Sequence, residues 1–149
     1  LRGNPGGLLT ASVKVASEFL KDGERVVSVK GRDEKKEELL YALEDGRNWK
    51  MPIAVLMDHN SASASEILAG ALKAYGLATI VGEASVGKGT VQTVYNLKLD
   101  AGMVLTTAKY YLPDGTTIAG KGVTPDIVVE MPPEERSRSR LSLLHRTSL

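Results

Sequence analysis

The sequence predicts an α/β domain, because a strand, an amphipathic helix and a second strand follow one another at its centre. Residues 52–57 (PIAVLM) form an apolar, partly β-branched run of strand length. From Ile67 to Tyr75 apolar residues recur at helical spacing, and Gly76 is placed to end that helix. Residues 78–81 supply the next strand.

The other elements follow from the same patterns, taken in chain order. In the first part we expect a glycine-rich turn at 1–7, a helix at 8–21 that ends near Gly23, a strand at 25–30, a charged loop at 31–38 and a return strand at 39–43. After the central segment we expect a hairpin of strands 90–99 and 103–112, a turn at 113–115 and a last strand at 127–130. The composition changes at Pro132, which predicts a folded core at 1–131 and a disordered Arg/Ser-rich tail at 132–149.

Composition excludes several functional classes. The 149 residues are enough for one domain, and a net charge of +1 gives no electrostatic case for binding nucleic acid. There is no cysteine, which rules out thiol catalysis, and no apolar run approaches the length of a membrane span. No cofactor or metal is expected. Because Leu1 is not an initiator methionine, we expect this chain to be a fragment.

A serine cluster lies where the first central strand meets the helix. Ser61, Ser63 and Ser65 fall at the predicted helix N-terminus, where unpaired amides and the helix dipole favour developing negative charge. Helix capping explains the same residues, since Ser63 and Glu66 fit the capping box S-x-x-E. Capping does not exclude catalysis.

Lys88 lies in a glycine-rich loop, residues 82–89, that returns towards the serines if the two central strands are neighbours. This loop matches most of a phosphate-binding P-loop, but Gly89 stands where Ser or Thr is needed, and the next segment is predicted to be a strand. Ser85-x-x-Lys88 also fits the S-x-x-K pattern of penicillin-recognising enzymes, although its glycines disfavour the helix that this pattern requires. A third interpretation makes Lys88 the base for a serine, which requires burial to lower the lysine pKa.

A second glycine turn, Gly6-Gly7, leads into the predicted first helix. Its backbone amides could form half of an oxyanion hole. A simple chain reversal explains the two glycines equally well.

Four ordered motifs resemble the tail-specific, carboxyl-terminal processing proteases, a family of serine–lysine peptidases. The motifs are LRGNPGGL at 1–8, SASASEI at 61–67, GKGTVQ at 87–92 and GKGVTPDI at 120–127, so the resemblance covers about residues 1–130. It implies that Ser63 is the nucleophile, Lys88 the general base and Gln92 the residue that holds the lysine. It also implies oxyanion donors at the amide of Ala64 and at Gly6 or Gly7. An aspartate that some members carry corresponds to Ala74 here, which puts only that aspartate's role in doubt.

The resemblance further implies that residues 1–131 are a partial protease catalytic core. This core would be ClpP/crotonase-like, built of ββα units and truncated here at its N-terminus. The function it implies is an endopeptidase that cleaves proteins near their C-termini, with a PDZ domain elsewhere in the parent chain. The expected partners are protein or peptide substrates with apolar C-termini, and a homo-oligomer is conceivable. The implied location is the periplasm or another extracytoplasmic space, with possible membrane association through a missing N-terminus. The alternative is a non-catalytic crotonase-fold module that binds peptides or serves as a scaffold.

Overall fold

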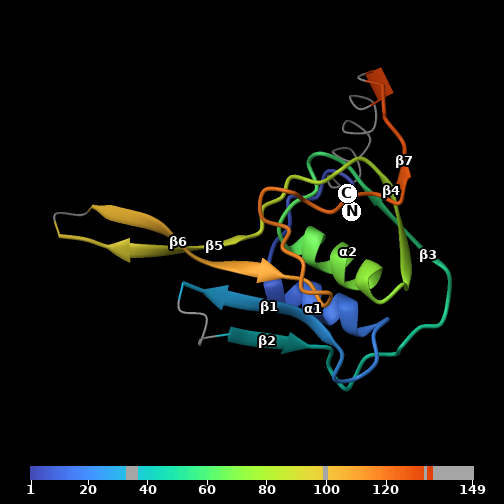
Figure 1. Ribbon diagram of the computed structural model, residues 1–149, viewed down its shortest axis with the longest axis horizontal. Helices are drawn as coiled ribbons and strands as arrows, with labels where there is room; N and C mark the ends of the chain where they lie inside the picture. Colours follow the sequence, from blue (N-terminus) through green and yellow to red (C-terminus); the bar gives the residue numbers. More distant parts are fainter. Residues whose placement is uncertain (33–36, 99–100, 133, 136–149) are drawn as a thin grey trace, which may run out of the picture.

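The computed structural model describes residues 1–32, 37–98, 101–132 and 134–135 of the chain. The described elements, in chain order, are α1 (Leu9–Ser17), β1 (Arg25–Gly31), β2 (Glu37–Tyr41), β3 (Ile53–Met57), α2 (Ala64–Ala74), β4 (Ala78–Gly82), β5 (Thr90–Asn96), β6 (Gly102–Tyr111) and β7 (Ile127–Val128). Two sheets form on either side of the helices (Figure 1). The α/β fold class is therefore confirmed.

The smaller sheet is parallel, with strand order β3-β4-β7. Its first two strands pair from Ile53 with Ala78 to Met57 with Gly82, and α2 is the connection between them. Parallel neighbours end at the same edge of a sheet, so the segments that follow β3 and β4 meet there. This confirms the condition under which the Lys88 loop returns to the serine cluster.

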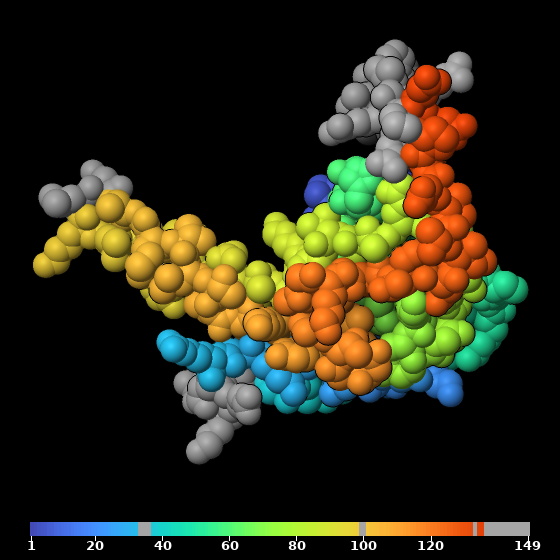
Figure 2. All heavy atoms as spheres, turned by 45° about the horizontal axis from the view of Figure 1, so that its top comes forward, coloured from blue at the N-terminus to red at the C-terminus, as the bar shows by residue number. Residues whose placement is uncertain are grey.

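The larger sheet is antiparallel, with strand order β2-β1-β6-β5. In it β6 pairs with β5 over most of its length but with β1 only over residues 108–111. The predicted hairpin therefore extends beyond the rest of the sheet. We call β5 together with residues 102–107 of β6 the arm, and Figure 2 shows it standing out from the body of the molecule.

The core surrounds α2, the most deeply buried element, which packs against α1 and β4. Its apolar side chains have the helical spacing expected from the sequence. Fully buried or nearly so are Ala16, Leu20, Val26, Val27, Met57, Ile67, Ala69, Ala71, Leu72, Ile80 and Ile118. This packing fixes the N-terminus of α2, where the serine cluster lies.

Several predicted boundaries were wrong. The first helix ends at Ser17 and not at 21, because the buried Ser17 hydroxyl donates to the Val13 carbonyl and accepts from the Leu43 amide. The return strand lies at Glu37–Tyr41, two residues earlier than predicted, and the last strand has only two residues. Half of the predicted charged loop (33–36) and most of the predicted tail (133 and 136–149) lie outside the described residues.

Candidate active site

Ser63 has a strained backbone at the junction between the β3 end and α2. It is the N-cap residue of α2, with φ 55° and ψ −119°. A positive φ is uncommon for a residue with a side chain, and such strain persists only where the surrounding structure imposes it. Strained serines on a strand-to-helix turn are typical of nucleophiles, because the turn presents the hydroxyl at the helix N-terminus. The Ser63 side chain is partly exposed.

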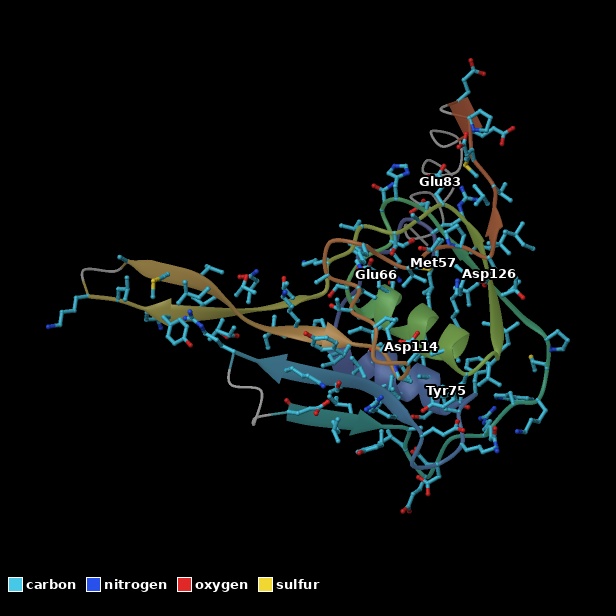
Figure 3. All side chains as sticks on the ribbon, in the orientation of Figure 1. Met57, Glu66, Tyr75, Glu83, Asp114 and Asp126 are labelled. Atoms are coloured by element: carbon cyan, nitrogen blue, oxygen red, sulfur yellow. The ribbon has the colours of Figure 1, made fainter. Side chains whose placement is uncertain are left out.

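Glu66 holds this turn from inside the protein. Its carboxylate is completely buried, and its Oε2 accepts a hydrogen bond from the Ser63 amide at 2.7 Å (Figure 3). This is the carboxylate half of the predicted capping box. The same carboxylate also accepts from the Ser85 hydroxyl at 2.5 Å, the Gly87 amide at 2.6 Å and the Lys88 amide at 2.9 Å.

One oxygen atom therefore joins the candidate nucleophile to the candidate base. Oε2 of Glu66 accepts from the amides of both Ser63 and Lys88, so these two backbone positions are fixed relative to each other. The sequence suggested Glu66 only as a helix cap. Its link to the lysine loop crosses more than twenty residues, and no local pattern indicates it.

The side chains of Lys88 and Gln92 do not contact the Ser63 hydroxyl. Lys88 is exposed, and within the described part of the chain its Nζ makes no hydrogen bond or ion pair, so it does not reach the Ser63 hydroxyl. The Gln92 side chain is also exposed and donates to Thr106 Oγ1 at 2.7 Å, across the hairpin. The structure thus brings the backbones of Ser63 and Lys88 together without forming the dyad, and the roles of Lys88 and Gln92 remain predictions.

The Gly6-Gly7 turn lies against the serine. A Cβ atom on Gly6 would lie 2.6 Å from the Ala62 carbonyl oxygen, 2.8 Å from the Ala64 amide nitrogen and 2.9 Å from the Ser63 Cβ. Only glycine allows an approach this close, and the φ of +95° at Gly6 also favours it.

The two glycine amides differ in their availability. The Gly6 amide donates to the Asn4 side chain at 2.9 Å, whereas within the described chain neither Gly7 nor Ala64 uses its amide in a hydrogen bond. An oxyanion hole at this turn would therefore use the amides of Ala64 and Gly7. Its assignment stays a prediction.

Asp58 ties the first residues to the end of β3. It accepts hydrogen bonds from the amides of Gly3 and Asn60, at 3.0 and 2.9 Å. Burial alone would raise the pKa of Asp58, but these two bonds, together with His59 and the Ser61 hydroxyl, hold the pKa below its ordinary value. The buried Ser61 donates to the Leu1 carbonyl and accepts from the Asp58 amide, so its role is to support this turn.

The last motif, at 120–127, locks the lysine loop from the other side. The Gly120 amide donates to the Gly87 carbonyl, and the Val123 amide donates to the Ser85 hydroxyl. The loop then enters strand β5 and not a helix, so the structure lacks the helix N-terminus that a P-loop requires. His59 lies in a turn after β3, and its Nδ1 lies 2.7 Å from Glu83 Oε2.

The described residues contain no cluster of three or more His, Cys, Asp or Glu side chains suited to hold a metal ion. None of their helices has the length and apolar character needed to cross a bilayer.

The family model for peptidase family S41 matches residues 1–129, and the chain belongs to that family. It is 48% identical over 136 residues to a carboxy-terminal-processing protease of Bartonella bacilliformis, covering 91% of this chain and 31% of that protein. It is 42% identical over 134 residues to a probable CtpA-like serine protease of Staphylococcus aureus, covering 89% of this chain and 27% of that protein.

A solved structure of another C-terminal processing protease is also similar to this chain. The photosystem II D1 C-terminal processing protease superposes with a TM-score of 0.78 at 37% identity, over 87% of this chain and 33% of that one. The resemblance inferred from the four motifs is thereby confirmed. The chain spans about a third of the length of the relatives it matches.

Proposed function

We propose that this chain carries the catalytic site of a serine endopeptidase that processes protein C-termini. The observation that carries the proposal is the strained Ser63, held at a helix N-terminus by the carboxylate that also holds Lys88. The names of the relatives in family S41 support the same reaction class.

In the proposed reaction, neutral Lys88 takes the proton of the Ser63 hydroxyl as its oxygen attacks the scissile carbonyl carbon. The amides of Ala64 and Gly7 stabilise the oxyanion that forms. The carbon–nitrogen bond then breaks, and the Lys88 ammonium returns the proton to the leaving amine. Water, activated by the same lysine, hydrolyses the acyl-enzyme, and Gln92 orients the lysine through both steps.

Lys88 must move or be covered for this reaction, because a lysine is a base near neutral pH only when desolvation lowers its pKa. We propose that parts of a longer parent protein or the substrate complete its pocket. We also propose apolar substrate C-termini, selection by a PDZ domain in the parent chain and an extracytoplasmic location.

The test uses the intact parent enzyme with a fluorophosphonate serine probe and a peptide-cleavage assay. Labelling of Ser63 and cleavage are both expected, and both should disappear in Ser63→Ala and in Lys88→Ala. Lys88→Arg is the matched control, since arginine keeps the positive charge but cannot act as a base, and it too should be inactive. Full cleavage by any of these variants would refute the dyad.

One observation favours a second function, a peptide-binding module without catalysis. The Lys88 side chain is exposed and does not contact Ser63 in the described structure. Peptide binding by the intact parent, with no cleavage and no labelling of Ser63, would support that alternative.

A further inference from the structure

The free edge of β5 begins beside the catalytic loop. In the sheet order β2-β1-β6-β5, β5 is an outermost strand, and the described residues place no strand along its other side. It starts at Thr90, two residues after Lys88, whose amide shares an oxygen of Glu66 with Ser63. The edge therefore starts next to the loop that Glu66 ties to the candidate nucleophile, and it runs outward from there.

Apart from a bulge between Val91 and Gln92, this edge lacks the features that normally prevent a strand from pairing. Exposed edge strands usually carry charges or proline, which block the addition of another strand. At the opposite side of the sheet β2 does so, with Glu37 paired to Lys30 and Glu38 beside it. In contrast, β5 (TVQTVYN) has neither a charge nor a proline.

The arm also offers an apolar face beside this edge. Directly opposed residues of an antiparallel pair share a face, so Tyr95 lies with Met103, and Thr93 with Leu105. Tyr95, Met103 and Leu105 are 44%, 38% and 43% exposed, which is a large apolar area for a surface with no partner in the described structure.

From these observations we infer that the edge of β5 binds the polypeptide substrate as an added strand. This inference rests on the proposed function and names how that site takes its substrate. Backbone groups of the substrate pair with β5, and every second substrate side chain lies over the face of Tyr95. The seven residues of β5 extend about 23 Å, which accommodates six or seven substrate residues.

An added strand also gives Lys88 the cover that it lacks. The lysine is exposed at the start of the edge, so a substrate chain laid along β5 from Ser63 passes next to it. Substrate binding and shielding of the base are then one event, and a small substrate that does not reach β5 leaves the lysine in water.

Two other edges compete for the same role. The outer side of β6 has no partner over residues 102–107 of the described chain, and β3 is the longer of the two uncharged edges of the smaller sheet. Neither continues from the loop that carries Lys88. Variants on all three strands separate these possibilities.

The first experiment uses the intact parent enzyme and an extended peptide in which one backbone amide at a time becomes an ester. Each replacement removes one N–H donor and keeps every side chain. On one side of the scissile bond, we expect kcat/KM to fall about fivefold to tenfold at every second position, since only alternate N–H groups face β5. Losses without this period of two would overturn the inference.

The second experiment compares Val94→Lys on β5 with Val104→Lys on β6 and Leu56→Lys on β3. Val94 and Val104 face each other and are 65% and 60% exposed, so the lysines should disturb folding equally. For the peptide, Val94→Lys should raise KM at least fivefold, and the other two variants less than twofold. Equal effects, or a larger effect of either comparison variant, would overturn the inference.

A small activated ester separates this inference from the proposed function. All three lysine variants should hydrolyse it as the wild type does, because it does not reach β5. If the wild type cleaves neither this ester nor the peptide through Ser63, the proposed function fails. Normal ester hydrolysis with an unchanged peptide KM in Val94→Lys overturns the edge inference alone.

Sedimentation tests whether the edge binds a second copy of the chain. A wild-type dimer that dissociates in Val94→Lys would assign the edge to that second copy and overturn the inference.

Discussion

Gly6 and Gly7 are adjacent in the sequence but differ in what a side chain would meet. A Cβ on Gly6 would collide with the backbone of Ala62 and Ala64 and with the Ser63 side chain, whereas a Cβ on Gly7 would meet nothing within 4 Å. We therefore expect Gly6→Ala to lower kcat at least a hundredfold, because it moves the nucleophile and the candidate oxyanion amide.

Gly7→Ala is the matched control for that variant. It keeps the backbone N–H, so it should retain more than a third of the activity and melt near the wild-type temperature. Peptide cleavage and thermal unfolding of the intact enzyme measure both effects. Equal losses in the two variants would show that the turn acts through general flexibility and not through contact with Ser63.

At Glu66 one buried carboxylate accepts four hydrogen bonds, two at each oxygen. In Glu66→Gln an amide NH₂ replaces one oxygen, so two donors lose their acceptor. We expect a loss of about 2–4 kcal/mol in the free energy of unfolding and a large fall in kcat, since both Ser63 and Lys88 lose their anchor.

The exposed Glu38→Gln on β2 serves as the control and should change neither quantity measurably. Denaturant unfolding and steady-state kinetics of the same samples measure the stability and the activity of the two variants. Near-normal activity in a folded Glu66→Gln protein would contradict the positioning role of the carboxylate.

At the scale of elements, the hydrophobic pattern of the sequence predicted where helices and strands form, but it did not predict the boundaries that long-range hydrogen bonds set. Helical spacing from Ile67 to Tyr75 identified α2, and alternation identified the β5–β6 hairpin. The end of α1 at Ser17 and the bulge between Val91 and Gln92 were not predictable, because both depend on contacts between distant segments.

In the candidate site, too, some features follow from local sequence patterns and others depend on contacts between distant segments. The turn that holds Ser63 and the loop that holds Lys88 follow from local glycines, serines and helix-capping patterns. The orientation of the Lys88 side chain does not, because it depends on what covers the loop. The joint role of Glu66 was missed for a related reason, since the capping box describes only its local half.

Asp126 joins the segment before β7 to α2 and β4. Its carboxylate accepts from Lys73 Nζ at 2.7 Å and from the Ile80 amide at 2.8 Å. The hydrogen bond from Lys73, followed by that from Ile80, holds the pKa of Asp126 below its ordinary value. A carboxylate with a lowered folded-state pKa stabilises the fold above its unfolded pKa, and this contribution is lost as the pH falls through the folded value.

We therefore expect Asp126→Asn to lower stability at pH 7 by less than about 1 kcal/mol, since the pair is partly exposed to solvent. The difference from the wild type should shrink as the pH falls below about 4. Thermal unfolding between pH 7 and pH 3 measures it, and Lys73→Met with the double variant isolates the ion pair. A difference that grows on acidification would contradict the assignment.

At the scale of the whole molecule, the body and the arm differ in how they are stabilised. In the body, α2 is buried between the two sheets, and Met57, Ile67 and Ile80 are at most 1% exposed. In the arm, residues 102–107 of β6 pair only with β5, and most of the large apolar side chains of the two strands are exposed (Figures 1 and 2). Local stability follows buried apolar contact, so the two parts should open independently.

Hydrogen exchange of the 149-residue chain tests this division. Amides of the arm should exchange through local opening at rates insensitive to mild denaturant, while those of α2, β3 and β4 exchange only through global unfolding. The amides of Gly87 and Lys88 lie in a loop, yet they should be protected like α2 because both donate to the buried Glu66. Fast exchange at these two amides would show that the link between Ser63 and Lys88 does not persist in solution. Arm amides as protected as α2 would show that the body and the arm are one cooperative unit.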